Sequence, residues 1–404
     1  YILMNDIVLE NLVPIDVDIA SLDGNNKVIK IRSFAVGVDR TEYGLFANIG
    51  KYQDINGVTQ TTILKNVIVD YSEFNSSLNL TNNEITDIAF GGLVANNGGL
   101  IYNCDVLNLS STSKVINILL DNNSEVEIVF GGLVANNSGI ITNSRVGRLG
   151  YTKITADQDS ETSVQLGGGA LTFVIGDSAH STESGQGFVG VTAGFVGRNT
   201  GTIASSYVAN TGITNYSTAP EGTTANYSMT AGFVGENAST GVISYSYVKA
   251  LENTISETNP HSTGVEIYSP TNGNVAGFAY LNAGKISNSF ANTVLTSTSA
   301  YVAGFVYNNQ AGAEISESYA ACTLNGVFTA NDASEQPFVG VSNSDELLSF
   351  GKLDNTYYLI DGDNSYIVKT ESGKDQATGL NQENFTNSGS LNGFVFIESN
   401  SRIE

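Results

Sequence analysis

The chain is poor in several residue types on which common classes of protein depend. Its 404 residues include no tryptophan, two cysteines, two histidines and five prolines. Without tryptophan, it lacks the large flat ring on which sugar-binding clefts usually stack their ligand. It has no run of about 18 apolar residues, so we expect no transmembrane helix in this chain. It also lacks a charged-then-apolar leader, and we interpret it as a mature product or an excised part of something longer.

Positive charge is scarce as well. The chain carries 17 Lys and Arg residues against 40 Asp and Glu residues, for a net charge of −23. Such a surface repels nucleic acid and anionic membranes, so we predict no nucleic-acid partner. It suits a solvated, non-sticky exterior or a cation-binding one, and the solvated exterior is the simpler interpretation.

What the chain does contain is a phrase that recurs. "FGGLVANN" occurs at Phe90–Asn97 and again, unchanged, at Phe130–Asn137, and looser copies such as "AGFVGRN" from Ala193 follow. Seven copies align on the glycine that precedes Leu or Phe. This structural repeat column consists of Gly44, Gly92, Gly132, Gly194, Gly232, Gly277 and Gly304. An asparagine column follows it, with Asn48, Asn97, Asn137, Asn199, Asn237, Asn282 and Asn309.

A second phrase follows most copies, as in "GLIYNCDV" from Gly99 and "GIITNSRV" from Gly139. Its Ile101 column and its Cys104 column recur from copy to copy. Short β-branched segments bounded by Gly and Asn predict strands rather than helices. Because every unit repeats in the same direction, like segments are expected to stack on like in parallel. We therefore predict an all-β fold, a parallel β-helix (β-solenoid) with loop insertions.

The spacing of the glycines predicts which coils carry insertions. The shortest interval between neighbouring repeat glycines, from Gly277 to Gly304, is expected to be close to a bare coil. The longest interval, from Gly132 to Gly194, is predicted to hold an extra coil with decoration, the alternative being a loop hairpin.

Two explanations are open for the glycines and asparagines of the repeat. Glycine suits either a corner with a positive φ or a close approach of the next layer's backbone. Asparagine tolerates the left-handed conformation and also bonds along a stack of asparagines. Leu93 and Val94 are adjacent, so on a flat strand they would face opposite sides. Either the chain bends there, or one of the two apolar columns faces outward.

The two cysteines fall in different repeats. Cys104 and Cys322 are about five copies apart. Layers about 4.8 Å apart would separate their sulfurs by about 24 Å, far beyond the reach of a disulfide. We predict two small buried thiols, which argue neither for nor against secretion.

The repeated "GGLVANN…G.I.NC" and "AGFVG.N…G.IS.SYV" resemble the GLUG repeat of bacterial and archaeal surface proteins. The opening "YILMNDIVLENLVPI" (Tyr1–Ile15) and the turn "SLDGNNKVIKI" (Ser21–Ile31) are similar to the start of such domains. The segments "NTYYLIDGDNS" (Asn355–Ser365) and "TGLNQENFTNSGSLNGFVF" (Thr378–Phe396) resemble their closing part.

The resemblance spans nearly the whole chain, with departures at Asn26, where the family prefers Gly, and at Tyr357, where it often has Cys. It implies a right-handed β-helix on secreted or surface proteins such as adhesins, S-layer-like proteins and non-catalytic parts of surface proteases. It does not imply a set of catalytic residues.

On these grounds we predict a right-handed parallel β-helix of GLUG-like repeats over residues 1–336 and a C-terminal closing, cap-like region over residues 337–404. The expected function is structural or adhesive, at a cell surface or in the extracellular space. The expected partner is a protein or glycan ligand, or further copies of the chain, with other domains or subunits flanking it. A subunit of an extracellular sheath or filament and a carbohydrate-active β-helix enzyme are the alternatives.

No catalytic or cofactor-binding residue is predicted, but several groups merit a check. An enzyme of this fold needs paired carboxylates, for which Asp157, Asp159 and Glu161 are the candidates, although a solvated acidic loop explains them as well. Weak calcium candidates are Asp361, Asp363, Asp157, Asp159 and the turn Leu22–Asn26, none with EF-hand spacing. The histidines, His180 and His261, lie in different loops. "GFVGRNTG" has neither the Lys-Ser/Thr nor the following helix of a phosphate-binding loop.

One further feature is an aromatic column in the second phrase. Tyr207, Tyr247, Phe290 and Tyr319 recur at its same position. Such a column either presents ring faces to sugars or simply covers the wall of the solenoid, and the second interpretation is favoured.

Overall fold

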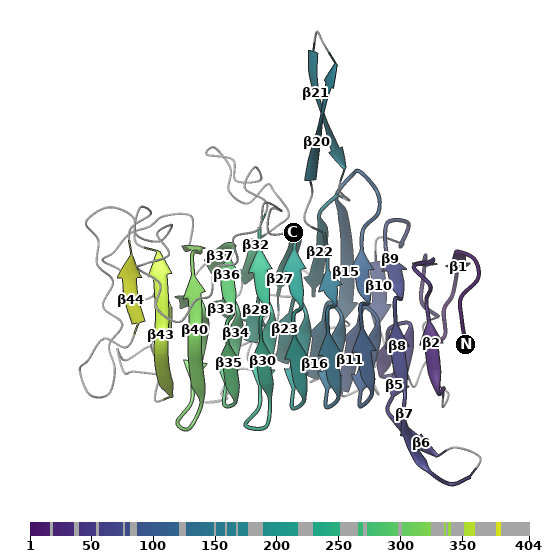
Figure 1. Ribbon diagram of the computed structural model, residues 1–404, viewed down its shortest axis with the longest axis horizontal. Coiled ribbons are helices and arrows are strands. Elements are labelled where there is room, and N and C mark those ends of the chain that lie inside the picture. The colour runs from purple at the N-terminus through teal and green to yellow at the C-terminus, as the bar shows by residue number, and fades with distance from the viewer. Residues whose placement is uncertain are drawn as a thin grey trace.

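The computed structural model describes residues 1–16, 19–35, 40–53, 56–75, 77–80, 87–120, 127–148, 151–157, 160–166, 169–176, 189–216, 229–250, 266–269, 273–297, 301–324, 335–336, 338–340, 351–359 and 377–380. Throughout these ranges the regular elements are strands, with no helix. Figure 1 shows the strands stacked side by side along the long axis, from β1 and β2 at one end to β43 and β44 at the other. Nearly all pairings are parallel, so the predicted all-β parallel solenoid is confirmed.

From residue 42 to residue 324, each coil passes through the same four sheets, which we number I to IV in the order in which the chain visits them. One coil runs through β11 (Asp87–Gly91) in sheet I, β12 (Val94–Asn97) in sheet II, β13 (Leu100–Tyr102) and β14 (Asp105–Leu107) in sheet III, and β15 (Lys114–Leu120) in sheet IV. The next coil repeats this path, and its strands pair in parallel with those of the coil before.

The remaining strands extend the same sheets. Sheet I also contains β4 (Glu42–Tyr43), β16 (Glu127–Gly131), β23 (Val189–Ala193), β28 (Met229–Ala231), β33 (Asn274–Ala276), β38 (Val302–Ala303) and β42 (Glu335–Gln336). Sheet II also contains β5 (Phe46–Ile49), β17 (Val134–Asn137), β24 (Val196–Asn199), β29 (Val234–Asn237), β34 (Ala279–Asn282) and β39 (Val306–Asn309). Sheet IV also contains β10 (Ser77–Leu80), β22 (Leu171–Ile175), β27 (Thr211–Asn215), β32 (Glu266–Ser269), β37 (Val294–Ser297) and β41 (Thr323–Leu324).

Sheet III is the widest because most coils contribute two short strands to it. Its other members are β1 (Ile7–Leu9), β2 (Ser21–Asp23), β3 (Val28–Ile31), β8 (Ile63–Lys65), β9 (Ile68–Asp70), β18 (Ile140–Thr142), β19 (Arg145–Val146), β25 (Thr202–Ala204), β26 (Tyr207–Ala209), β30 (Val242–Ser244), β31 (Tyr247–Lys249), β35 (Lys285–Ser287), β36 (Phe290–Asn292), β40 (Glu314–Ala320), β43 (Lys352–Leu359) and β44 (Ala377–Leu380). Since β43 and β44 add to this sheet in parallel, its ladder continues beyond residue 337, where we predict the closing region to begin.

Two antiparallel hairpins leave the solenoid. One pairs β6 (Lys51–Gln53) with β7 (Thr59–Thr61), and the other pairs β20 (Tyr151–Asp157) with β21 (Ser160–Leu166). The second projects from the body of the molecule in Figure 1. It lies in the longest interval of the repeat, between Gly132 and Gly194, where we predicted an extra coil. That prediction is wrong, because β17 pairs directly with β24 and the interval is a single coil with a hairpin inserted.

The core is a set of stacked apolar columns. The aromatic column after the repeat glycines stacks in register, with ring centroids 4.7 to 4.9 Å apart from Phe195 through Phe233, Phe278 and Phe305 to Phe338. Leu93 and Val94 are both wholly buried in the same core. The N–H groups of these two residues donate to one carbonyl, that of Leu133, because the chain bends between sheets I and II. The bend therefore turns both apolar columns inward.

A close approach of backbones, rather than a positive φ, explains most of the repeat glycines. A Cβ added to Gly92 would overlap the carbonyl oxygen of Gly132, and one added to Gly132 would overlap that of Gly194. The column glycines up to Gly277 show the same relationship to the next coil. Of the seven, only Gly44 has a positive φ, of 155°.

The first copy is one residue shorter at the corner than the others. Tyr43 pairs with Phe90 and Phe46 with Val94, so two residues span the corner where later copies use three. As a consequence, Asn48 pairs with Asn96 rather than with Asn97. The placement of Asn48 in the column of Asn97 is therefore wrong.

The two cysteines are free and buried, as predicted. Cys104 begins a ladder along sheet III in which the backbone N–H of each member donates a hydrogen bond to the hydroxyl oxygen of the next. The ladder runs through Ser144, Ser206, Ser246, Ser289 and Ser318. Cys322 lies elsewhere, with its sulfur 3.2 Å from the carbonyl oxygen of Gly304.

Candidate functional site

Sheet II ends in a buried asparagine ladder. Each side-chain amide donates to the side-chain oxygen of the next, over 2.6 to 2.8 Å, through Asn97, Asn137, Asn199, Asn237, Asn282 and Asn309. The oxygen of Asn97 also accepts the backbone N–H of Gly99, which closes the turn into sheet III. Bonding along the stack is thus the role of this column, whereas its members have no positive φ. The left-handed residues are instead those at the corner within sheet III, such as Asn66, Asn103 and Asn143.

A second ladder lies on the outer face of the same sheet. Asn136 donates to Asn96 over 2.9 Å, and Asn96 donates to Asn48 over 3.0 Å. Asn48 then donates to the carboxylate of Asp16 over 3.1 Å. A carboxamide has two N–H groups and two lone pairs, so this ladder occupies only about half of the hydrogen-bonding capacity of each amide.

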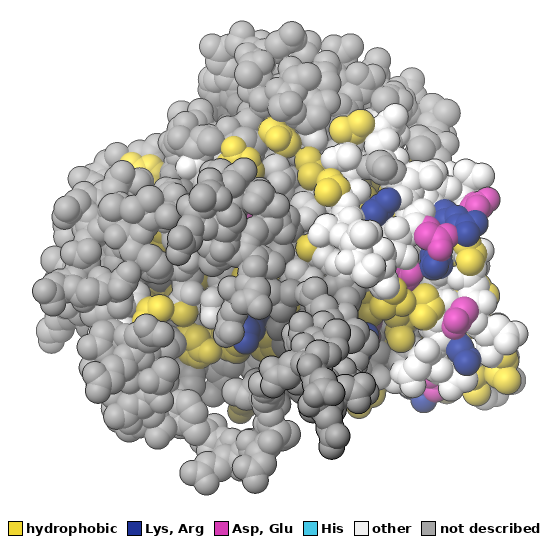
Figure 2. Space-filling view, turned by 90° about the horizontal axis from the view of Figure 1, so that it is seen from above, with side chains coloured by type: hydrophobic (Ala, Val, Ile, Leu, Met, Phe, Trp, Pro, Cys, Tyr) yellow, Lys and Arg dark blue, Asp and Glu magenta, His cyan; other side chains and the backbone are white. Residues whose placement is uncertain are grey.

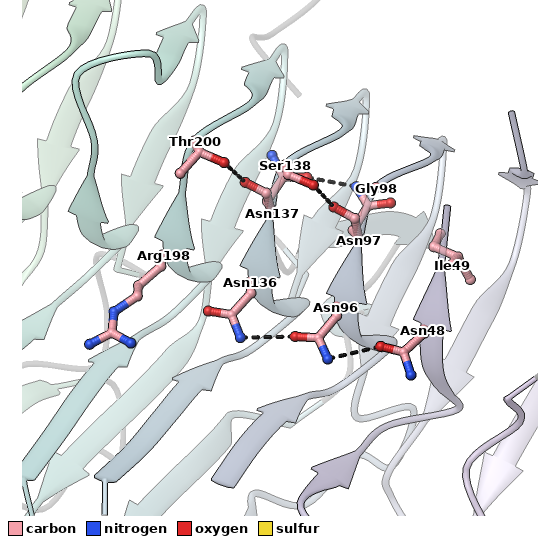
Figure 3. Close-up of a pocket in the computed structure, with 10 residues that line it drawn as sticks. All are labelled: Asn48, Ile49, Asn96, Asn97, Gly98, Asn136, Asn137, Ser138, Arg198 and Thr200. Atoms are coloured by element: carbon pink, nitrogen blue, oxygen red, sulfur yellow. Dashed lines mark hydrogen bonds between the residues drawn. The ribbon is translucent and has the colours of Figure 1, made fainter. Parts of the chain in front are cut away.

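The outer ladder lines a shallow groove of about 400 Å³. Figure 3 shows Asn48, Asn96 and Asn136 in one row, with Arg198 at the end of that row. A second row lies alongside, at the turn that follows sheet II. The lining residues are Asn48, Ile49, Asn96, Asn97, Gly98, Asn136, Asn137, Ser138, Arg198 and Thr200.

Arg198, at the end of the groove, forms ion pairs with two carboxylates. Its guanidinium pairs with Glu127, which stands on sheet I, and also with Glu236 on the next coil, over 3.3 Å. The pair with Glu127 spans the corner between sheets I and II. With both carboxylates only partly exposed, the cation is held in place while the side chain itself remains 37% exposed.

The groove therefore offers amides, hydroxyls and one held guanidinium at the repeat distance of a parallel sheet, which is about 4.8 Å. Amide and hydroxyl groups both donate and accept hydrogen bonds, so this arrangement can bind an extended polar chain lying along the solenoid. Among the described residues that line the groove there is no carboxylate, histidine or cysteine, and the polar groups present are amides, hydroxyls and one guanidinium.

The sequence pattern did not single out the outer row. The signal was present in "VANN", where two asparagines follow each other on one strand. Because neighbouring residues of a strand face opposite sides, one of the two must point outward when the other is buried. Asn97 is the buried one and Asn96 the outward one.

The aromatic column of sheet III does not present ring faces along its length. Tyr207, Tyr247, Phe290 and Tyr319 stack with centroids 4.7 to 4.9 Å apart and interplanar angles of 2 to 6°. Each ring face between neighbours is covered by the next ring, which supports the interpretation of this column as wall. Arg145 stands beside Tyr207 and donates to its hydroxyl and to Asp105. Burial raises the pKa of Tyr319 to about 12.

Of the predicted acid candidates outside the turn Leu22–Asn26, the structure describes Asp157 and Glu161, which lie on the paired strands of one hairpin, one register step apart. Asp159, Asp361 and Asp363 lie outside the described residues, as do His180 and His261. Asp157 ends β20 and pairs with Ser160 across the hairpin. Glu161 is also on that hairpin, in β21. Within the described ranges, no three His, Cys, Asp or Glu side chains gather as a metal site would require.

In the turn Leu22–Asn26, also a calcium candidate, the carboxylate of Asp23 is already bonded to other protein groups. Asp23 accepts hydrogen bonds from the side chain of Asn66 and the backbone of Asn25, and it pairs with Lys65 over 3.1 Å. The bond from Asn66 contributes most to a lowered pKa, about 2, for Asp23.

No family model, curated protein or solved structure matches this chain. The GLUG-repeat assignment therefore stays a prediction that rests on the motifs quoted above. Among the described residues, no helix is long and apolar enough to span a membrane.

Proposed function

We propose that the protein is a non-catalytic structural or adhesive element of a cell surface or of the extracellular space. The observation that carries the proposal is the outer face of sheet II, where a row of exposed and half-buried amides extends over three successive coils beside a groove. The buried asparagine ladder beneath this face and the buried serine ladder in sheet III join each coil to the next. A solenoid bonded in this way holds its outer contacts at fixed spacing, as an adhesive surface requires.

The ligand that suits this groove is an extended glycan strand. Amide and hydroxyl groups pair with sugar hydroxyls, which are also both donors and acceptors. Each rung contributes weakly because its amides already bond to one another. Several rungs acting on one strand gain affinity through their effective concentration. The negative charge of the chain favours neutral over strongly anionic glycans.

Binding to immobilised neutral glycans tests the proposal. We expect the double variant Asn96→Ala with Asn136→Ala to bind at least about tenfold more weakly, a change of about 1.4 kcal/mol. The matched control is Thr142→Ala with Ser287→Ala on the outer face of sheet III, which is expected to bind like the wild type. A wild-type protein that binds no glycan, or a double variant with unchanged affinity, would contradict the assignment of this groove.

The two alternatives stay open as proposals with tests of their own. A sheath or filament subunit would add copies through strand edges, and electron microscopy of the purified protein would show rods that grow with concentration. A carbohydrate-active enzyme would turn over uronic-acid or neutral glycans in a product assay. Turnover that persists after the groove variants would place the chemistry elsewhere on the chain.

A further inference from the structure

A lysine and an aspartate face each other on neighbouring coils near the first strands. Lys30 of β3 and Asp70 of β9 are register partners in the parallel ladder of sheet III. The Lys30 ammonium lies 3.8 Å from Oδ2 of Asp70 and 2.5 Å from Oε1 of Glu73. Figure 2 shows Lys and Arg side chains gathered with Asp and Glu side chains at this end of the molecule. The three side chains thus place an amine donor, Lys30, next to an acceptor carboxyl, Asp70, and a second carboxylate, Glu73.

The Asp70 carboxyl is buried and oriented. Its side chain is 1% exposed, against 26% for Lys30 and 43% for Glu73. Oδ1 accepts two backbone N–H groups, from Ser72 over 2.9 Å and from Leu109 over 3.0 Å. Oδ2 accepts the Ser72 hydroxyl over 2.7 Å. Two fixed N–H donors on one carboxyl oxygen are the arrangement that stabilises a developing oxyanion in acyl transfer.

We propose that Lys30 and Asp70 condense into an intramolecular amide bond, with Glu73 as the proton carrier. Glu73 takes a proton from the ammonium, and the neutral amine attacks Cγ of Asp70. The negative charge of the tetrahedral intermediate collects on Oδ1, between the N–H groups of Ser72 and Leu109. Oδ2 then leaves as water with the two protons that the nitrogen loses, one of them returned by Glu73. The charges of the ammonium and the carboxylate cancel, and no oxidant or co-reactant is needed.

Proximity is what makes the condensation favourable. Amide formation from free amine and carboxylate is disfavoured in water, but well-oriented intramolecular pairs reach effective molarities of about 10⁵ M or more. The two side chains arise from paired positions of adjacent strands, so little freedom is lost when the bond forms. The hydrogen bond from Lys30, followed by that from Arg32, lowers the pKa of Glu73. Glu73 is therefore ionised at neutral pH but a weak base, and we expect the bond to form slowly.

The chain contains a matched pair that lacks these features. Lys65 of β8 and Asp23 of β2 are also register partners, and their ion pair is shorter, at 3.1 Å. Asp23 is more exposed, at 24%, and only one of its two donors is a backbone N–H. Among the described residues, no second carboxylate pairs with Lys65. Distance alone would favour this pair, whereas an oriented carboxyl and a proton carrier favour Lys30 and Asp70.

Mass spectrometry of the full chain, made in a host that does not glycosylate it and incubated at neutral pH, tests the proposal. We expect the intact mass to fall by the mass of one water molecule, and fragment spectra to join the peptide of Lys30 to that of Asp70. Lys30→Arg keeps the positive charge and is expected to retain the full mass. Glu73→Gln is expected to slow the loss at least tenfold, while Lys65→Arg leaves it unchanged. Circular dichroism verifies that each variant is folded.

Three results would overturn the inference. One is a wild-type protein that keeps the full mass after prolonged incubation. The second is a loss of water that persists in Lys30→Arg. The third is a cross-link found between Lys65 and Asp23 to the same extent, which would show that mere proximity on paired strands is responsible.

Discussion

Asn97 donates its side-chain N–H to the side-chain oxygen of Asn137 over 2.6 Å, and both residues are buried. The two residues occupy the same position in the twin copies of "FGGLVANN". Their bond is the first of a series that runs coil by coil to Asn309. A buried amide that both donates and accepts within one ladder fixes the register of neighbouring coils, because a shift by one residue would break every bond.

Asn137→Ala is expected to destabilise the protein by about 3 kcal/mol. The change leaves the N–H of Asn97 and the oxygen of Asn199 without their ladder partner, and each buried unsatisfied group costs about 1–3 kcal/mol. Urea unfolding followed by circular dichroism measures the loss. Asn136→Ala, on the outer face one residue earlier, is the control and is expected to cost less than about 1 kcal/mol. Equal losses at the two positions would show that the ladder does not stabilise the fold.

Gly132→Ala is expected to destabilise the protein by about 3 kcal/mol or to prevent folding. The new methyl group would meet backbone atoms, which cannot move aside as a flexible side chain can. The added methyl group would overlap the carbonyl oxygen of Gly194 on the next coil. The matched control is Gly50→Ala, where no heavy atom lies within 4 Å of the new Cβ. It is expected to stay within about 0.5 kcal/mol of the wild type in thermal unfolding. A tolerated Gly132→Ala would mean that the coils can separate locally at no cost.

Phe233→Ala is expected to cost about 3–5 kcal/mol, as is usual for a large buried aromatic residue. Phe233 lies between Phe195 and Phe278, with ring centroids 4.7 and 4.8 Å away. Phe233→Leu is expected to cost clearly less, because the same column already holds Leu93 and Leu133 in earlier coils. Chemical denaturation of both variants gives the comparison, and a leucine variant as unstable as the alanine one would argue that ring stacking, not volume, is what matters here.

Alkaline pH is expected to destabilise the fold through its buried acids. Burial raises the pKa of Cys104 and of Cys322 from 9.0 to about 12. As the pH rises, the thiols of the unfolded chain lose their protons before those of the folded chain, which favours unfolding. The stability that the two protonated thiols contribute is therefore complete below about pH 9 and is lost as the pH rises through about 12. Tyr43, raised to about 12 by burial, acts in the same direction.

Thiol labelling checks the same burial directly. We expect a thiol reagent at pH 8 to leave both cysteines of the native protein unmodified and to label both once denaturant is added. Labelling of the native chain at either position would show that its coil opens readily at that point.

Much of the architecture follows from the repetition of short phrases. Like residues in parallel coils must stack, so the columns of Phe233, Ile101 and Ser144 were visible as aligned letters. The same logic separated Cys104 from Cys322 and left both as buried thiols, as the structure confirms. These predictions did not depend on the loop lengths, because the alignment of the columns uses the recurring residues and not the spacing between them.

The corner between sheets I and II was decided only by three-dimensional packing. Repetition showed that Leu93 and Val94 both belong to apolar columns, but only the bend of the backbone turns both inward. The shorter corner of the first copy also shifts Asn48 onto Asn96, which no column of letters reveals. The hairpin in the longest interval of the repeat was misjudged for a related reason. The length of that interval suits either a coil or a hairpin, and only the direct pairing of β17 with β24 excludes the coil.

The same division holds for the sites. The inner and outer roles of adjacent asparagines depend on which face of sheet II meets the core. The pairing of Lys30 with Asp70 depends on the register between β3 and β9, strands that lie far apart in the sequence and share no repeated phrase. The repeated sequence determines which residues form the stacked columns, because equivalent residues of successive coils lie next to one another. The turns and registers that place unlike residues together depend on the backbone path, which the chain acquires only when it folds.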